Sequence, residues 1–186
     1  MDKKMTAAPY ETMESAIVYE GAIVDVKRDR IALPNGGTAL REIVLRGEAA
    51  AILPVDSDGR VVLVRQYRHA VGKIVTEIPA GMLDAGEDPR ECAIRELREE
   101  TGLTASRVDP LFKMNSAIGF CSEAIYIYEA RGLTSGETDP DDEEFIEVVK
   151  LPLDEAVGMI FAGEITDGKT IAALLAYGRS PAYDGK

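Results

Sequence analysis

The chain has 186 residues, 46% of them hydrophobic, and a formal net charge of −12. This length and apolar content predict one sizeable domain, or one domain with a small extension, rather than a disordered tail. The acidic charge excludes general electrostatic binding to nucleic acid or to an anionic membrane, while a local basic pocket stays open.

The N-terminal part of the chain reads as strands. Residues 15–31 alternate in polarity and carry β-branched side chains, so we expect one extended strand with a bend at Gly21. The Asn-Gly-Gly segment at 35–37 is a strong hairpin signal, and residues 38–46 are the expected return strand. These strands predict a small sheet over residues 1–46, ahead of a main domain over residues 47–180.

The middle of the chain is more apolar. Residues 49–56 and 61–68 predict a second, more buried hairpin, joined through the turn "DSDG". Residues 73–81 predict a short strand that ends at Pro79.

A helix is predicted over residues 88–101, with Asp88 as the N-cap, Pro89 in the first turn and Gly102 as the stop. Strands that alternate with few helices favour a mixed sheet covered by helices, an α/β class. The elements expected after this helix are strands at 111–120, 122–131 and 145–151, and amphipathic helices at 153–163 and 167–178.

No segment of the sequence marks export or membrane insertion. No run approaches the ~20 apolar residues of a membrane span, and the stretch "MDKKMTAAPYETMESA" lacks the apolar core of a secretory signal. The two cysteines, Cys92 and Cys121, form no CxxC pair, so neither a disulfide framework nor a zinc site is indicated. We therefore expect a soluble cytoplasmic protein with buried free thiols and with neither membrane nor nucleic-acid partners.

Three glutamates on the helix at 88–101 are the main candidates for chemistry. At about 100° per residue, Glu96, Glu99 and Glu100 share one arc about 100° wide, where like charges repel. A divalent cation offsets this repulsion, and oxygen-only ligation suits Mg²⁺ or Mn²⁺ together with substrate phosphates. Arg95 lies four residues before Glu99 and can steady it. The alternative is a solvated charged face with a Glu–Arg network.

The context of these glutamates favours the metal site over the charged face. A chance match to the whole pattern is roughly one in a million, given average residue usage. The pattern resembles the Nudix box of the Nudix hydrolase family. Its positions are Gly81, Glu87, Arg95, Glu96, Leu97, Glu99, Glu100, Gly102 and Leu103.

The resemblance extends over roughly residues 15–180 and is closest to the ADP-ribose pyrophosphatase branch. It implies a Nudix α/β/α sandwich that cleaves the pyrophosphate of ADP-ribose, or of a related nucleoside diphosphate sugar, into a nucleoside monophosphate and a sugar phosphate. One departure is Ile118, where the branch usually has proline in a Ser-Pro-Gly-like turn, which puts the preferred substrate in doubt. The matching segments are "REIVLRG", "VRQYR", "EIPAGM", "GFCSE" and "FIEVVKLPLDEAVGMIFAGEI".

The resemblance also implies the metal ligands. Glu96 and Glu100 are the first ligands of Mg²⁺, or of Mn²⁺, and Glu99 is a direct or water-mediated third. The carbonyl of Ala80 matches a main-chain ligand of this branch. Glu87 is expected to be structural instead, because it precedes the helix and can bond backbone donors there.

Substrate contacts are implied at five positions. Arg41 and Arg68 match family positions that contact the diphosphate or the terminal ribose, and an arginine fork suits phosphate oxygens. Each arginine has the alternative of an ordinary strand residue with a solvated head. Met82, Gly119 and Glu123 are the remaining expected contacts.

The general base in this branch comes from an acidic loop, here "DPDDEEF". Glu144 is the preferred base, with Glu143 next and Asp142 also in reach of the role, because this loop precedes the strand at 145–151. The alternative is a solubilising loop. Tyr19 and Tyr67 are the nearest candidates to stack on a purine, or both are core residues.

The N-terminal strands predict an assembly. They leave sheet edges open, and in the resembling branch this sheet pairs across a two-fold axis. We therefore expect a homodimer, with Arg41 and Tyr19 near a substrate site shared between subunits. Two other functions stay open: another Nudix pyrophosphohydrolase that removes nucleoside triphosphates, and a non-catalytic ligand-sensing module.

Overall fold

The computed structural model describes residues 9–136 and 145–179. The chain divides into two compact units. The first comprises Met1–Arg46 with Ala117–Glu123, and the second comprises Gly47–Ser116 with Ala124–Lys186.

The first unit is built on a three-stranded antiparallel sheet in the order β1-β2-β3. The single bent strand expected over residues 15–31 is wrong, because the chain reverses at Gly21 and pairs with itself. A Cβ at Gly21 would lie 2.6 Å from the Tyr19 ring and 2.8 Å from the Val24 carbonyl oxygen, so this turn requires glycine. The strands are β1 (Thr12–Glu20), β2 (Asp25–Ala32) and β3 (Thr38–Leu45).

The segment Ala117–Glu123 belongs to the first unit because it bonds to β3. The Val44 amide donates to the Phe120 carbonyl at 2.7 Å, and the Ser122 amide donates to the Val44 carbonyl at 3.0 Å. The strand expected at 111–120 is therefore wrong at its C-terminal end. Residues after Asn115 leave the sheet of the second unit and turn along β3.

The second unit contains two sheets. The hairpin expected from 49–56 and 61–68 is wrong, because β4 and β5 lie in different sheets and share only the bridge between Val55 and Val61. Both edges of β4 are already paired, one with β7 and one with β9. The mixed sheet has the order β7 (Ala80–Met82), β4 (Ala49–Pro54), β9 (Ala124–Ser135), β8 (Leu103–Asn115), and the antiparallel sheet β10 (Glu147–Pro152), β5 (Arg60–Arg68), β6 (Lys73–Glu77).

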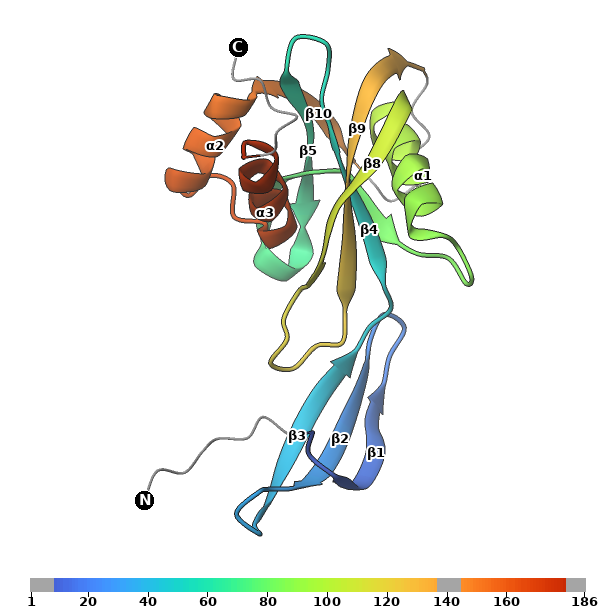
Figure 1. Ribbon diagram of the computed structural model, residues 1–186, viewed down its shortest axis with the longest axis vertical. Coiled ribbons are helices and arrows are strands. Elements are labelled where there is room, and N and C mark those ends of the chain that lie inside the picture. Colours follow the sequence, from blue (N-terminus) through green and yellow to red (C-terminus); the bar gives the residue numbers. More distant parts are fainter. Residues whose placement is uncertain (1–8, 137–144, 180–186) are drawn as a thin grey trace. The chain divides into compact units, whose positions relative to one another are not determined.

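Helices cover the second unit on both sides (Figure 1). Strand β4 is buried on both faces: Ala50 and Ile52 pack in the core beneath α1, whereas Ala51 and Leu53 pack in the core with α2 and α3. This arrangement confirms the predicted α/β/α sandwich. The helices are α1 (Pro89–Thr101), α2 (Leu153–Phe161) and α3 (Gly168–Tyr177), with a short 3₁₀ turn η1 (His69–Val71) after β5.

Local signals explain where α1 and β6 end. Asp88 caps α1 by accepting the Arg90 amide at 2.9 Å, and Gly102 ends it at φ 68°, as predicted. The expected strand at 73–81 is instead split into β6 and β7. Its Pro79 has no amide hydrogen to donate to a sheet, and the Ile78 amide donates to the Thr170 hydroxyl.

Both cysteines are free thiols, as expected, but they differ in burial. Cys92 is a buried residue of α1, whereas Cys121 is only partly buried, so the expectation of two buried thiols holds for Cys92 alone. No helix among residues 9–136 and 145–179 is long and apolar enough to cross a membrane.

Candidate active site

The guanidinium of Arg95 lies among the glutamates of the 81–103 motif. Its Nη1 is 2.6 Å from Glu96 Oε1 and 3.0 Å from Glu99 Oε2. Its Nε is 3.0 Å from Glu87 Oε1. The expectation that Arg95 steadies Glu99 is confirmed, and Arg95 also reduces the repulsion among the three carboxylates.

Glu87 fixes the loop that leads into α1. Its carboxylate accepts the Asp84 amide at 2.9 Å, in addition to the contact with Arg95. Arg95 and the Asp84 amide together lower the pKa of Glu87 from its usual value to about 2. The expectation that Glu87 bonds a backbone donor before the helix is confirmed.

Glu96 and Glu100 are both buried, with exposed fractions of 9% and 3%. They lie one turn apart on α1, so both side chains project from the same face of the helix. The Glu96 carboxylate lies against Gly81 of β7, where any Cβ would fall on its oxygen atoms. Glycine at position 81 therefore gives the Glu96 carboxylate its place beside the strand that begins at Ala80.

Arg68, at the end of β5, forms a two-pronged ion pair. Its Nε and Nη2 donate to the two oxygens of Glu77 at 2.7 and 3.2 Å. Glu77 raises the pKa of Arg68 above its usual value, and the charges of Glu100 and Asp167 add to this effect. The end of β5 thus lies within electrostatic reach of the buried glutamate on α1.

The first unit carries Arg41, Gly119 and Glu123. Arg41 is exposed on β3, and its Nη1 donates to the neighbouring Leu40 carbonyl at 2.9 Å. Glu123 is held by Arg46, whose Nε lies 2.7 Å from Glu123 Oε1. Gly119 is exposed, and a Cβ there would meet no atom within 4 Å.

The sequence from the end of β3 to α3 matches a known family: residues 45–174 match the NUDIX domain. The chain belongs to the Nudix hydrolase family. The resemblance seen in the motif is confirmed.

Several relatives of this Nudix chain have named activities. It is 33% identical over 172 residues to the ADP-ribose pyrophosphatase of Bacillus subtilis (strain 168), covering 91% of this chain and 93% of the relative. It is 39% identical over 166 residues to the methanol dehydrogenase activator of Bacillus methanolicus, covering 88% and 90%. It is 37% identical over 155 residues to a GDP-mannose pyrophosphatase of Yersinia enterocolitica, covering 76% and 81%.

A solved structure shares the fold. An ADP compounds hydrolase superposes with a TM-score of 0.84 at 23% identity, covering 92% of this chain and 94% of that one. This likeness confirms the Nudix architecture.

The donor set of the Nudix helix fits a divalent cation. Among the described residues, no three His, Cys, Asp or Glu side chains converge as a ready metal-binding group, and Arg95 bonds oxygens of Glu96 and Glu99. Nevertheless, Glu96 and Glu100 are buried hard oxygen donors one turn apart, and Gly81 leaves the space beside Glu96 clear of a side chain. Buried carboxylates of this kind are stable when cations neutralise them.

Other expected residues lie at the edges of the second unit or outside the described residues. Met82 is exposed on β7, and Tyr67 is exposed on β5, so neither is a core residue. Asp142, Glu143 and Glu144 lie outside the described residues.

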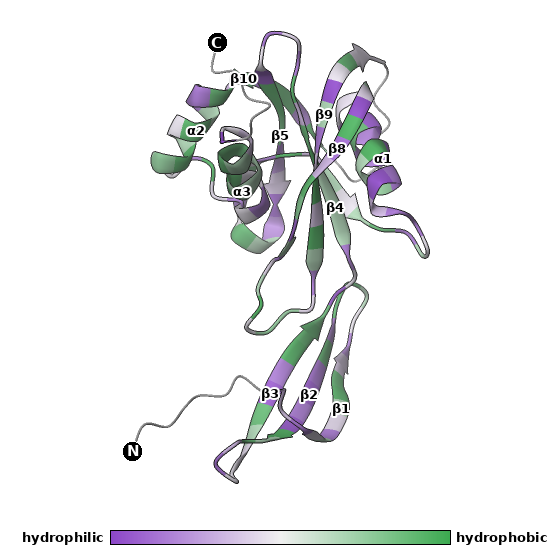
Figure 2. Cartoon of the chain, in the orientation of Figure 1, coloured by the Kyte–Doolittle hydropathy of each residue, from purple (hydrophilic) through white to green (hydrophobic). Residues whose placement is uncertain are grey.

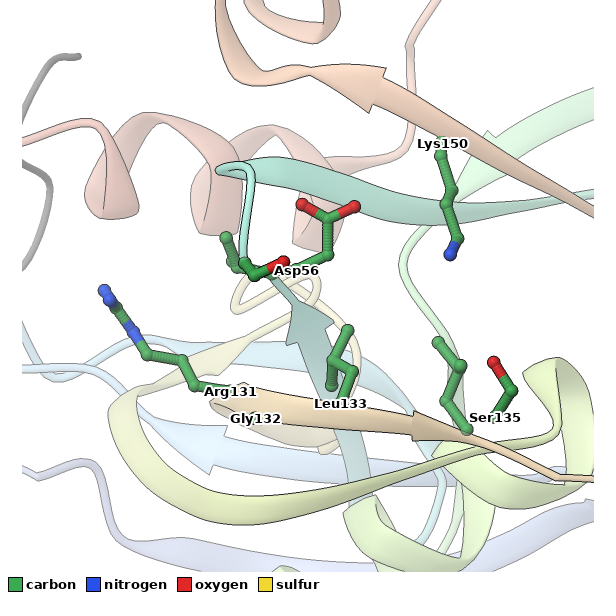
Figure 3. Close-up of a pocket in the computed structure, with 9 residues that line it drawn as sticks. Asp56, Arg131, Gly132, Leu133, Ser135 and Lys150 are labelled. Carbon is green, nitrogen blue, oxygen red and sulfur yellow. The ribbon is translucent and has the colours of Figure 1, made fainter.

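A cavity of about 490 Å³ lies elsewhere in the second unit. Figure 3 shows Lys150 reaching toward the strand that carries Leu133, while Arg131 extends away from it. The Arg131 guanidinium bonds Glu129 and the Tyr177 hydroxyl, at 3.2 and 3.1 Å. Its lining includes Leu103 of the 81–103 motif but none of the predicted metal, substrate or base residues. Its lining is Val55, Asp56, Ser57, Leu103, Arg131, Gly132, Leu133, Ser135 and Lys150.

Sequence reasoning missed the residues around Arg68. Glu77 is buried, with an exposed fraction of 3%, and it contacts both Arg68 and Lys169 of α3. The available signal was a glutamate inside the apolar run "KIVTEIPAG", where a buried charge needs partners. No sequence pattern pointed to Lys169, because it lies 92 residues from Glu77.

Proposed function

We propose that this protein hydrolyses the pyrophosphate bond of ADP-ribose or a related nucleoside diphosphate sugar, giving a nucleoside monophosphate and a sugar phosphate. The buried pair Glu96 and Glu100 carries this proposal: Glu96 lies against Gly81, and Glu100 is within electrostatic reach of Arg68. Relatives named ADP-ribose pyrophosphatase and GDP-mannose pyrophosphatase support the substrate class.

Each residue has a proposed task. Glu96, Glu100, Glu99 and the Ala80 carbonyl hold Mg²⁺, or Mn²⁺ in its place, which when bound neutralises charge on the diphosphate. Arg68 donates to diphosphate oxygens through the guanidinium edge that Glu77 does not use. Glu144 or Glu143 accepts the proton of the attacking water, as the P–O bond forms and the bridging P–O bond breaks.

The first unit supports the proposal of a homodimer. Its sheet exposes several large apolar side chains, and Figure 2 shows hydrophobic segments along β1 and β3. A second copy of the chain would bury these side chains across a two-fold axis. The exposed residues are Met13, Ile17, Val18, Tyr19 and Leu40 on the strands, and Ile23 in the turn between β1 and β2. A cytoplasmic location and substrate binding by Arg41, Met82, Gly119 and Glu123 stay predictions.

A substrate panel tests the proposed activity. ADP-ribose, GDP-mannose, a UDP-sugar and ATP are incubated with Mg²⁺, with Mn²⁺ and with EDTA, and the products are resolved by chromatography. We expect a monophosphate and a sugar phosphate, formed only with metal. Faster release of pyrophosphate or phosphate from ATP would favour the triphosphate-removing alternative.

A second candidate function rests on the methanol dehydrogenase activator, whose name describes an effect on another enzyme. A ligand-sensing or activating role predicts that ADP-ribose binds, as measured by calorimetry, while no compound in the panel is hydrolysed. Hydrolysis that depends on Glu96 and Glu100 would exclude a purely non-catalytic role.

A further inference from the structure

We infer that Glu77 and Lys169 are positioning residues that hold Arg68 in the orientation in which it binds the substrate diphosphate. The inference rests on the proposed function and adds two residues to it. Neither residue contacts substrate in this scheme, because both act through the Arg68 guanidinium.

The buried Glu77 carboxylate bonds both Arg68 and Lys169. Both carboxylate oxygens are used: Oε1 accepts Arg68 Nε at 2.7 Å, and Oε2 accepts Arg68 Nη2 at 3.2 Å and Lys169 Nζ at 2.5 Å. The Glu77 side chain is 4% exposed, whereas that of Arg68 is 43% exposed. The buried Glu77 carboxylate therefore fixes the Nε–Nη2 edge of the planar Arg68 guanidinium through two hydrogen bonds. The Nη1 edge stays available to an anion.

The start of α3 anchors Glu77. Lys169 Nζ lies 3.1 Å from Asp167, which caps α3 by accepting the amide and hydroxyl of Thr170 at 3.0 and 2.6 Å. The same Thr170 hydroxyl accepts the Ile78 amide at 2.8 Å. The start of α3 thus holds the side chain of Glu77, through Lys169, and the backbone of Ile78, through Thr170. Ile78 lies two residues before Ala80.

Fold stability alone does not account for the cluster of Arg68, Glu77 and Lys169. A buried ion pair rarely stabilises a fold more than apolar residues of the same volume, because each charge loses its hydration. Arg68 is also within electrostatic reach of Glu100, so its orientation bears on the glutamate proposed to hold metal. Both facts favour a positioning role.

The chain provides a matched control at the other end of α3. Glu129, 5% exposed, pairs with Arg131 at 3.2 Å, and Arg131 bonds Tyr177 in the last turn of α3. This cluster also links a buried glutamate, an arginine and α3, but it lies at the C-terminal end of α3, whereas Lys169 lies at the N-terminal end. A purely structural role predicts similar effects from Glu77→Gln and Glu129→Gln.

The first test compares kcat/KM for ADP-ribose or GDP-mannose with melting temperature. We expect Glu77→Gln and Lys169→Met each to lower kcat/KM about tenfold or more, the size seen when groups that orient a functional residue are removed. Glu129→Gln should stay near the wild-type kcat/KM even if its melting temperature falls.

In an Arg68→Met background, Glu77→Gln should have little further effect on kcat/KM, because Glu77 acts through Arg68. Equal losses from both glutamate variants, or additive losses with Arg68→Met, would overturn the inference.

The second test does not depend on hydrolysis. In ¹⁵N-labelled protein, the Nε–H resonance of Arg68, assigned by its loss in Arg68→Lys, should exchange slowly with water. Glu77→Gln and Lys169→Met should speed this exchange, and Glu129→Gln should not. An unchanged exchange rate in Lys169→Met overturns the role of Lys169 whether or not the protein is a hydrolase. If the exchange rates change but no compound of the substrate panel is hydrolysed, only the proposed function is overturned.

Discussion

The buried carboxylates of Glu96 and Glu100 raise the free energy of the native state unless cations neutralise them. We expect Glu96→Gln and Glu100→Gln each to lower kcat about a thousandfold, because a lost ligand removes several kcal/mol of charge stabilisation. The melting temperature should change little, since each substitution also removes a repulsive charge. Steady-state kinetics over a Mg²⁺ titration, with calorimetric melting curves, measure both quantities.

Glu91→Gln is the matched control for this pair. Glu91 lies in the first turn of the same helix and pairs with Arg90 at 3.1 Å on the exposed surface. Its substitution should leave kcat unchanged. Near wild-type turnover of both Glu96→Gln and Glu100→Gln at saturating Mg²⁺ would refute their assignment as metal ligands.

A side chain at position 81 should impair the active site more than the stability of the fold. Gly81→Ala should displace the Glu96 carboxylate, because the added methyl group would fall on it. The displaced group is the end of a flexible side chain, so we expect a small loss of melting temperature and a large loss of activity. Gly158→Ala in α2 is the control: a Cβ there meets no atom within 4 Å, and removing a helical glycine should stabilise the protein by about 0.5–1 kcal/mol. A fully active Gly81→Ala variant would contradict this account of the glycine.

The two thiols should differ in reactivity. Burial raises the pKa of Cys92 to about 12, so below that pH it stays a protonated, unreactive thiol, while Cys121 is partly exposed. A maleimide reagent at pH 7.5 should label Cys121 in native protein and both cysteines after denaturation. Intact mass and peptide mapping give the stoichiometry, and fast native labelling of Cys92 would be the contrary outcome.

At the scale of elements, the sequence predicted those whose determinants are local. Helix α1 follows from Asp88, Pro89 and Gly102, which act within the helix itself. The hairpin expected around "DSDG" was wrong because both edges of β4 are paired with strands from other parts of the chain, which no local turn signal reveals. Glu96, Glu99 and Glu100 were likewise singled out from local spacing, whereas Lys169 was missed because only the tertiary fold brings it to Glu77.

The acidic segment before β10 gives a prediction at the same scale. The double variant Glu143→Gln/Glu144→Gln should bind substrate almost normally and turn it over slowly, because a base acting on water is needed mainly in the transition state. Single-turnover kinetics and equilibrium binding separate the two effects. A raised KM with unchanged kcat would make this segment a binding element instead.

At the scale of the whole molecule, the open edge of the first sheet predicts assembly. All nine residues of β1 are exposed, and in the described part of the chain β1 pairs on one side only. We expect a homodimer at micromolar concentration in sedimentation velocity, and a monomer after deletion of residues 1–46. The isolated second unit should bind substrate poorly even where the proposed metal site stays intact. A fully active full-length monomer would rule out a role for the dimer in substrate binding.

The hydrogen bonds between Val44 and the segment Ala117–Glu123 make the first unit discontinuous in sequence. The chain passes between the two units at three points, after Arg46, after Ser116 and after Glu123. A chimera that exchanges only the N-terminal sheet with that of a relative would therefore leave seven residues, 117–123, facing a foreign strand. Chimeras between members of this family should fold more often when residues 1–46 and 117–123 both come from the same parent. We therefore expect the sequences of β3 and of residues 117–123 to vary together among relatives.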